Sequence, residues 1–354
     1  MATADVVVMG GGIFGLSVAW ACVRRGARVH LCEAARIGAG SSGGIVGALA
    51  PHVPETWNPK KAFQLESLLM AEGFWGEVAA VSGIDPGYLR SGRWQPLADD
   101  AAVEMARGRE AGAAEFWRGR AGWRVVKSPP DGWAPESATG LMVEDTLTAR
   151  LNPRAAARAL VAAIRTKGGV VEEGRVEPPA GVLGPRRTAV VWATGMAGLE
   201  VLSSEVGRKV GAGVKGQAAL FACEAGARPQ IFAEGLHIVP HQDGTVAVGS
   251  TSERDFADGS AVDGQVEALI ERARALCPML REAPVIERWA GVRPRAKSRA
   301  PMLGPWPGRD RHYIANGGFK IGFGMAPKVA DVMADLVLEG RDGIPEGFRV
   351  EDSL

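Results

Sequence analysis

Cysteine, histidine and tyrosine are scarce in this chain, and their scarcity limits the chemistry that it can carry. The 354 residues include four cysteines, five histidines and two tyrosines. The cysteines show no spacing typical of metal ligands, so a zinc cluster is not expected. Most of them lie inside apolar segments, and we interpret them as buried, reduced thiols of a cytoplasmic protein. They are Cys22, Cys32, Cys223 and Cys277.

An excess of charge of either sign is also lacking. The chain has 41 Lys and Arg residues against 40 Asp and Glu residues, which gives a formal net charge of +1. This balance provides no electrostatic footprint for nucleic acid or for an anionic membrane surface. No segment reaches the roughly 20 apolar residues of a membrane span. The apolar run Val6–Val23 follows Asp5 and has no basic leader, so we expect a soluble protein without a signal peptide.

Glycine, by contrast, is abundant, and its most informative pattern lies near the N-terminus. Val6–Met9 is an apolar run of strand length, and Gly10, Gly12 and Gly15 follow it directly in G-x-G-x-x-G spacing. The apolar segment Ile13–Val23 then predicts a buried helix. This order is typical of a dinucleotide-binding unit, in which N–H groups at the start of the helix hold a pyrophosphate.

The unit continues with a second strand and an acidic residue. Arg28–Cys32 predicts the strand, and Glu33 follows it at the distance expected of the acid that binds a ribose hydroxyl. The charge of Glu33 would repel a 2′-phosphate. A Gly-rich turn in an ordinary α/β domain is the alternative, but strand, helix, second strand and acid in this order favour nucleotide binding.

A segment rich in small residues, AARIGAGSSGGIVGALAPHVPE, follows Glu33. Its few large side chains allow the backbone to run extended and close against a flat ligand. Ser41 and Ser42 are candidates to hydrogen-bond phosphate. A structureless loop of this length is unusual inside a compact domain unless it is functional, so we expect it to belong to the nucleotide site.

These motifs together resemble a known family. GGGIFG, Glu33, IGAGSSGG and GALAPH, in this order, are similar to the glycine oxidase and D-amino-acid oxidase family of FAD-dependent amine oxidoreductases. The resemblance implies that the cofactor is FAD. Binding should be non-covalent, since no cysteine lies near the closing motifs, where the related sarcosine oxidases attach FAD. The implied FAD-binding residues are Gly10, Gly12, Ile13, Phe14, Gly15, Glu33, Ala34, Ser41, Ser42, Val46, Gly47, Ala48, Val176, Gly195, Gly317, Gly318, Phe319, Lys320, Ile321 and Gly322.

The expected fold class is α/β, with α+β character overall. A Rossmann-like FAD-binding domain is expected over residues 1–85, 146–212 and 290–354. A second, substrate-binding domain built on a mixed, largely antiparallel β-sheet is expected over 86–145 and 213–289. Periodicity and breakers predict helices at 60–81, 99–120, from Pro153, at 263–276 and at 329–338, and strands at 88–98, 215–221, 236–240 and 245–251.

Two basic residues of the closing motifs are candidates to bind the substrate. Arg293 occupies the AG-x-RP position, where the family has the arginine that grips a substrate carboxylate, and a guanidinium matches a carboxylate bidentately. Lys320 stands in GFKIG, where glycine oxidases carry an arginine. It would help to hold the carboxylate or set the charge near the flavin; a solvated surface lysine is the alternative.

Three polar residues complete the expected site. His237 stands in LHIVP, where glycine oxidases have a tyrosine that faces the substrate, and Ser252 replaces a pocket methionine. His52 is a candidate polar group near the flavin. A structural histidine with a satisfied hydrogen bond is an equal alternative at positions 52 and 237. The expected pocket is more polar than that of glycine oxidases, so we expect glycine to be a poor substrate.

The expected function is FAD-dependent oxidation of the C–N bond of a small amino acid or amine carboxylate. Hydride passes to flavin N5 and the resulting imine hydrolyses to a keto acid. The expected partners are this substrate and either oxygen or another electron acceptor. One alternative is a quinone-linked dehydrogenase of D-amino acids or of secondary amino acids such as proline or sarcosine. Another is an FAD-binding partner without turnover, or a tRNA-modification module. The substrate, its stereochemistry, the acceptor and a homo-oligomeric state stay open.

Overall fold

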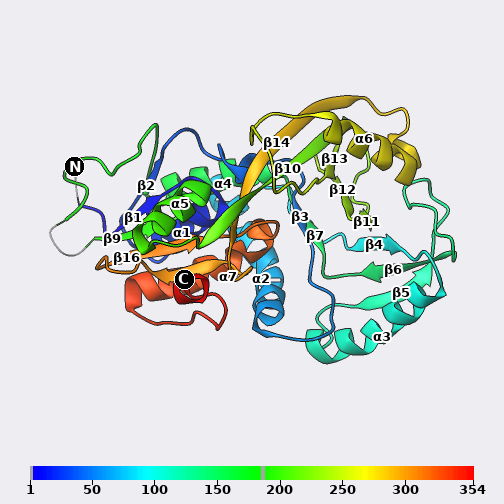
Figure 1. Ribbon diagram of the computed structural model, residues 1–354, viewed down its shortest axis with the longest axis horizontal. Coiled ribbons are helices and arrows are strands. Elements are labelled where there is room, and N and C mark those ends of the chain that lie inside the picture. The colour runs from blue at the N-terminus through cyan, green and yellow to red at the C-terminus, as the bar shows by residue number, and fades with distance from the viewer. Residues whose placement is uncertain (1–2, 185–187) are drawn as a thin grey trace.

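Two large β-sheets, one in each half of the molecule, organise the computed structural model (Figure 1). The structure describes residues 3–184 and 188–354; residues 1–2 and 185–187, which fall in the expected FAD-binding ranges, lie outside the described part. The long strands β10 and β14 run from one half toward the other (Figure 1). Within the described residues, no helix is both long and apolar enough to cross a membrane.

The first sheet has six strands in the order β15–β16–β9–β1–β2–β8. It is parallel except for the antiparallel pair β15–β16. β1 lies between β2 and β9 and is fully buried, as expected of a central strand that is covered on both faces. The strands are β1 (Val6–Met9), β2 (Val29–Glu33), β8 (Val170–Glu173), β9 (Ala189–Trp192), β15 (Met302–Pro305) and β16 (His312–Asn316).

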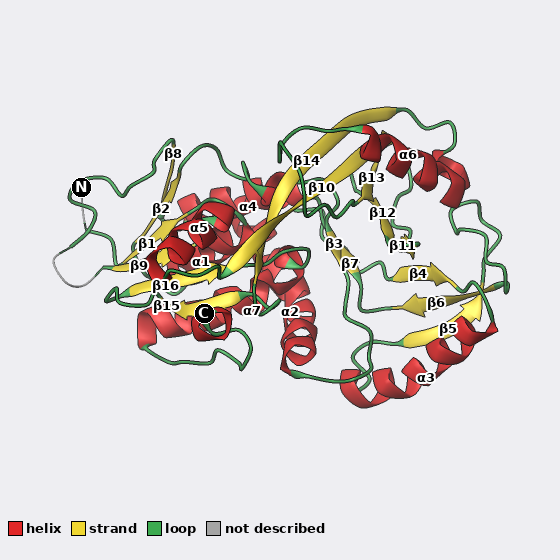
Figure 2. Cartoon of the chain, viewed as in Figure 1, coloured by secondary structure: helices red, strands yellow, loops and turns green. Residues whose placement is uncertain are grey.

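Most helices gather around this six-stranded sheet (Figure 2). α1 contacts α4 and α7, and α2 contacts the same two helices, so the four form one apolar layer. Asn152 caps α4 with Pro153 at its first position, as expected from the sequence, and Asn58 and Pro59 begin α2 in the same way. The helices are α1 (Ile13–Arg24), α2 (Pro59–Ser82), α4 (Pro153–Thr166), α5 (Gly195–Val206) and α7 (Gly322–Ala334), with a π-helical turn at Asp335–Glu339.

The second sheet has eight strands in the order β14–β10–β13–β12–β11–β4–β6–β5. All its pairs are antiparallel except β11–β4, so the expected mixed, largely antiparallel sheet is confirmed. The helix α6 (Gly264–Leu276) contacts β10 and β13, and α3 (Asp100–Trp117) contacts β5. The strands are β4 (Arg93–Pro96), β5 (Trp123–Lys127), β6 (Leu141–Asp145), β10 (Gly211–Ala222), β11 (Gln230–Ala233), β12 (Leu236–Pro240), β13 (Thr245–Gly249) and β14 (Val285–Ala296).

The short strands β3 (Ala48–Leu49) and β7 (Ala149–Arg150) lie between the two halves (Figure 1). They form a two-stranded antiparallel ladder. The remaining short 3₁₀ turns lie at Ser41–Gly43, Pro278–Leu280 and Val350–Ser353.

Side chains alternate along the strands of the eight-stranded sheet. One face of the sheet therefore packs against α6, and the other face points away from α6. Ile231 and Ile238 belong to the apolar core that α6 covers. Successive side chains of a strand point to opposite faces. Phe232 on β11 and His237 on β12 therefore point away from α6, and these two residues are directly paired.

Three elements differ from their expected limits. β14 pairs with β10 without interruption from Ala296 to Glu287, so the domain boundary expected at residue 290 falls inside one strand. β4 is shorter than the predicted strand 88–98. α7 begins at Gly322 instead of at residue 329, although Pro327 lies inside it. Burial of Met325 and Ala326 against neighbouring helices offsets the hydrogen bond that Pro327 cannot donate.

Two glycines of α3 provide a matched test of how this helix packs. A Cβ at Gly112 would lie 1.9 Å from the carbonyl oxygen of Pro54, whereas a Cβ at Gly108 would meet nothing within 4 Å. Gly108→Ala should therefore raise the free energy of unfolding by up to about 1 kcal/mol through helix propensity. Gly112→Ala should lower it, because the backbone at Pro54 must move. Thermal unfolding of both variants measures this; shifts of the same sign would contradict the packing.

Candidate active site

A cavity of about 1190 Å³ is lined by residues from both large sheets. It is large for a ligand pocket, which typically holds about 300–1,000 Å³. One end lies over the start of α1 and the carboxyl ends of the parallel strands, where ligands bind in open α/β sheets. The other end lies against the face of the eight-stranded sheet that points away from α6.

Glycines shape the first end by close backbone approach. Gly10 has φ +111°, and a Cβ there would lie 2.4 Å from the carbonyl oxygen of Ala193. A Cβ at Gly15 would lie 1.9 Å from the carbonyl oxygen of Gly10. Gly15 does not line the cavity; it lies behind Gly10 and lets α1 pack against the strand. Gly15 therefore contributes to the cofactor site through backbone packing and forms no part of the cavity wall.

The start of α1 presents backbone donors to the cavity. No side chain of the preceding residue caps this helix, and the Oγ of Ser42 accepts a hydrogen bond from the N–H of Ile13 at 2.9 Å. The N–H groups of Gly12 and Phe14 have no hydrogen-bond acceptor within the described residues. Free N–H groups at a helix N-terminus suit a pyrophosphate, so this end fits the phosphates of FAD.

Glu33 lies where β2 ends and lines the same part of the cavity. Its carboxylate accepts hydrogen bonds from the N–H groups of Gly11 at 2.6 Å and Ala35 at 2.9 Å. These bonds fix the carboxylate while leaving lone pairs for a ribose hydroxyl. Of the four cysteines, Cys32 alone lines the cavity, and burial raises the pKa of its thiol to about 11, so it stays protonated and unreactive.

The cavity collects the other residues that we expected to bind FAD. Val176 is 73% exposed and lines the cavity close to Glu177, as a backbone contact to adenine would require. The structure brings residues from distant segments of the chain together in the lining of one cavity. Their contacts with FAD stay predictions. Those in the lining are Gly10, Gly12, Ile13, Phe14, Glu33, Ala34, Ser41, Ser42, Val46, Gly47, Ala48, Val176, Gly195, Gly317, Gly318, Phe319, Lys320, Ile321 and Gly322.

Arg293 lies on β14 and reaches the other end of the cavity. Its side chain is 8% exposed, and its Nη1 donates to the carbonyl oxygen of Thr251 at 3.4 Å. It forms no ion pair with a carboxylate anywhere in residues 3–184 and 188–354. Desolvation lowers the pKa of Arg293 to about 10, against the opposing charge of Glu253. A buried cation without an anion is costly, so this site suits an anionic ligand.

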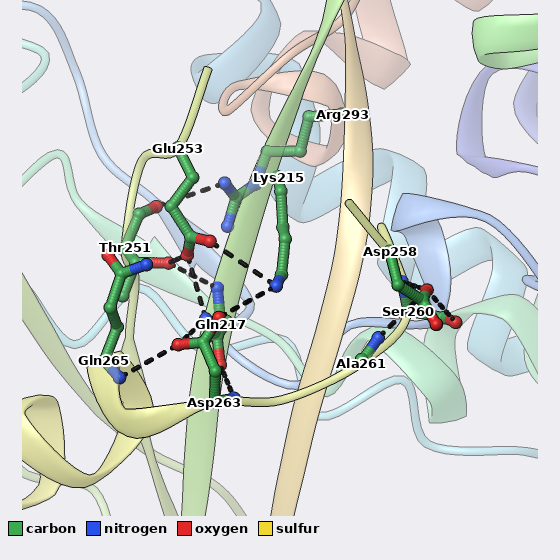
Figure 3. Close-up of polar contacts among 10 residues, drawn as sticks. All are labelled: Lys215, Gln217, Thr251, Glu253, Asp258, Ser260, Ala261, Asp263, Gln265 and Arg293. Atoms are coloured by element: carbon green, nitrogen blue, oxygen red, sulfur yellow. Dashed lines mark hydrogen bonds and ion pairs between the residues drawn. The ribbon is translucent and has the colours of Figure 1, made fainter. Parts of the chain in front are cut away.

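A polar network beside Arg293 explains why Glu253 does not neutralise it (Figure 3). The Nζ of Lys215 lies 3.5 Å from the carboxylate of Glu253 and 3.1 Å from that of Asp263. The side-chain amide of Gln217 donates to both carboxylates, at 3.0 and 2.8 Å. Glu253 is thus held by Lys215 and Gln217, and the guanidinium of Arg293 stays free of a carboxylate.

Lys320 adds a second cation to this end of the cavity. Its side chain is exposed, lines the cavity and forms no ion pair with a described carboxylate. Desolvation and the charge of Arg293 lower the pKa of Lys320. Its ammonium thus lies at the cavity wall and close enough to Arg293 to be affected by it.

The two candidate histidines differ in their surroundings, although both line the cavity. His52 is held by Gln64, whose side-chain oxygen lies 2.5 Å from its Nδ1 and accepts from its backbone N–H at 2.8 Å. The Nδ1 of His237 is buried and has no partner within the described residues. Desolvation, with the charges of Arg93 and Lys320, lowers the pKa of His237 to about 3, so its imidazole is neutral. His52 has the hydrogen-bond partner that a structural histidine requires, whereas the Nδ1 of His237 has none within the described residues, and a role of either residue in the reaction stays a prediction.

Ser252 was expected in the pocket, and the structure shows otherwise. The chain turns after β13 ends at Gly249, so that Ser252 is exposed and outside the lining, while Glu253 is the buried residue. Ser250 lines the cavity in its place. The alternation of inward and outward side chains along β13 does not extend to Ser252, because the strand ends at Gly249.

Sequence reasoning missed several residues of the sheet face. Phe232 and Trp289 form part of the cavity wall, and so does Arg93 on β4. The one signal in the sequence is the arginine of GRW inside a predicted strand, because a buried arginine requires a carboxylate partner. That partner is Asp145, whose distance in sequence hides the pair.

Comparison with known proteins decides the family. The model of the DAO family, FAD dependent oxidoreductase, matches residues 5–336. The chain belongs to this family of FAD-dependent oxidoreductases. The expected family, enzyme class and FAD cofactor are thereby confirmed.

Individual relatives agree with this assignment. Over 94% of its length the chain is 28% identical to the glycine oxidase of Pseudomonas putida, of which it covers 94%. It is 26% identical to the bifunctional protein ThiO/ThiG of Trichormus variabilis, over 95% of this chain but only 53% of that relative. The crystal structure of glycine oxidase from Geobacillus kaustophilus has the same fold, with a TM-score of 0.82 at 22% identity over 99% of each chain.

Glu33→Gln should weaken FAD retention, because it removes a charged acceptor worth about 1.5–3 kcal/mol from the ribose site. Glu173→Gln is the matched control: Glu173 ends the neighbouring strand β8 and accepts from the N–H of Ile37 outside the cavity lining. The dissociation constant of FAD, measured by flavin fluorescence on reconstituted apoprotein, distinguishes the two. Equal affinities for both variants and the native protein would move the adenosine site elsewhere.

Proposed function

We propose that this enzyme oxidises the C–N bond of a small amino acid or amine carboxylate to an imine, which water hydrolyses to a keto acid. The observation that carries the proposal is Arg293, a buried guanidinium at the cavity wall with no carboxylate partner within the described residues. A substrate carboxylate completes this site, because it supplies the missing anion in a bidentate geometry that guanidinium matches.

Binding of the carboxylate also orients the reacting carbon. With the carboxylate held by Arg293 and the ammonium of Lys320 nearby, the α-carbon is fixed relative to the cofactor end of the cavity. Such positioning converts an encounter into an intramolecular step and accounts for much of the rate enhancement in reactions of this kind. Bound FAD supplies the hydride acceptor.

The charges of this end favour the amine form that the reaction needs. Arg293 and Lys320 line the wall, and the cavity lining has no carboxylate at this end; Glu33 and Glu177, its carboxylates among the described residues, belong to the nucleotide end. Like charges disfavour an ammonium, so the substrate amine loses its proton more readily here than in water. The neutral His237, with a free Nδ1, suits a hydrogen bond from that amine.

The names of the relatives support the same reaction class, since glycine oxidase recurs among them. The proposal includes a small acceptor, oxygen or a quinone, and a cytoplasmic location. It rests on the carboxylate site, and a test of that site is therefore a test of the function.

Anaerobic mixing of the yellow holoenzyme with a panel of D-, L- and N-methyl amino acids and their amides tests the proposal. Arg293→Lys should raise the KM of an amino acid far more than that of its amide, since the lost fork costs roughly 2 kcal/mol or more. Arg288→Lys is the control: the same change on the same strand, in a partly exposed pair with Glu267. The proposal is contradicted if no amino acid bleaches the flavin, or if Arg293→Lys raises the KM of the acid and of its amide equally.

A further inference from the structure

A second arginine lies in the cavity wall, and its hydrogen bonding is incomplete. Arg93 is 5% exposed and lines the cavity from β4, the strand that pairs with β11. Its Nε donates at 2.7 Å to the carboxylate of Asp145, which does not line the cavity. The bond from Nε is the one hydrogen bond of this side chain within the described residues, so its two terminal nitrogens have no acceptor there. A guanidinium has five N–H donors, so most of its capacity is left for a ligand.

Asp145 is fixed as the partner behind Arg93. Its carboxylate is fully buried and also accepts from the N–H of Thr148 at 2.8 Å and from the Oγ1 of Thr148 at 2.9 Å. Asp145 therefore holds the Nε side of Arg93 in place and has no freedom to turn toward the terminal nitrogens. The guanidinium is preorganised to receive a second anion on its cavity side.

Two rings, those of Phe232 and His237, lie beside Arg93 in the cavity wall. The Cζ of Arg93 lies 5.7 Å from the centre of the Phe232 ring, and the Phe232 and His237 rings lie 4.5 Å apart. The charges of Arg93 and Lys320 both act on His237, and the charge of Arg293 acts on Lys320. Arg93, Phe232, His237, Lys320 and Arg293 thus line one cavity, and the Phe232 ring lies beside both Arg93 and His237.

The cationic donors at this end of the cavity exceed what one carboxylate can pair with. Arg293 and Lys320 have no carboxylate partner among the described residues, and the terminal nitrogens of Arg93 lack an acceptor there. An α-carboxylate at Arg293 leaves the terminal nitrogens of the buried Arg93 without an acceptor, and unmatched buried donors are costly. Phe232 and His237, which lie beside Arg93 in the cavity wall, offer ring surface against which the methylene groups of a short chain can pack.

We propose that Arg93 forms a second anion subsite, and that the substrate carries an acidic group on its side chain or amine substituent in addition to the carboxylate that Arg293 binds. The substrate class is then a dicarboxylic amino acid or amine. This proposal rests on the proposed function for the role of Arg293 but adds a binding site of its own.

The first test uses the native holoenzyme. Anaerobic flavin reduction is followed with aspartate against asparagine and glutamate against glutamine, in both enantiomers, since each pair differs in charge at equal size. The acid should exceed its amide by about tenfold or more in kcat/KM, as a charge-assisted pair predicts. Amides as good as the acids would overturn the subsite.

A second measurement does not depend on turnover. Succinate and glutarate should perturb the flavin absorbance at concentrations about tenfold or more below those required for butyrate and pentanoate. Tighter binding of the diacids supports the subsite even if no amino acid reduces the flavin, in which case only the proposed function fails. Equal affinities of diacids and monoacids overturn the subsite whatever the enzyme oxidises.

Variants assign the effect to Arg93. Arg93→Gln combined with Asp145→Asn avoids a buried unpaired carboxylate and should bring the ratio of diacid to monoacid affinity close to one. Arg109→Gln is the control, since Arg109 pairs with Glu55 outside the cavity lining, and it should keep the native ratio. If the double variant does not fold, the two measurements on the native protein still show whether a second anion subsite exists. A double variant with the native ratio would move the second subsite away from Arg93.

Discussion

The site depends on a buried positive charge that the protein does not neutralise. Arg293 reaches the cavity from β14, and the nearby carboxylate of Glu253 is held by Lys215 and Gln217. If Glu253 were free to turn, it would be the natural partner of Arg293 and would compete with any ligand anion. Burying an unpaired cation lowers stability, and the anion of a bound ligand would offset this loss because it would pair with Arg293.

The two ends of the cavity bind anions by different physical means. At the nucleotide end, free N–H groups and the dipole of α1 attract phosphate without a charged side chain, and glycines let the backbone approach closely. At the opposite end, fixed cationic side chains project from the strands of the eight-stranded sheet. The parallel sheet thus provides the cofactor site and the antiparallel sheet the substrate wall, and alternation along each strand decides which residues face the ligand.

How far the sequence predicts this site depends on how local each feature is. The strand, Gly10, the helix and Glu33 lie within one short segment, so their spacing alone predicts the nucleotide end. Arg293 was expected because of its motif. Arg93 and Asp145 become partners only when β4 pairs with β6, and Lys215 meets Glu253 only across a strand and a turn. The burial of Glu253 in place of Ser252 depends on where β13 ends, and the start of α7 depends on packing that outweighs Pro327.

One measurement tests the central claim, that Lys215 keeps Glu253 away from Arg293. The dissociation constant of a simple carboxylate such as propionate is measured by flavin absorbance in the native holoenzyme, in Lys215→Met and in Lys215→Met combined with Glu253→Gln. Thermal unfolding establishes that each variant is folded. The account predicts weaker binding in the single variant, where Glu253 keeps Gln217 but loses its cationic partner and is drawn toward Arg293, and recovery in the double variant, where the charge of Glu253 is gone. Unchanged affinity in Lys215→Met, or weak binding that Glu253→Gln does not restore, would contradict it.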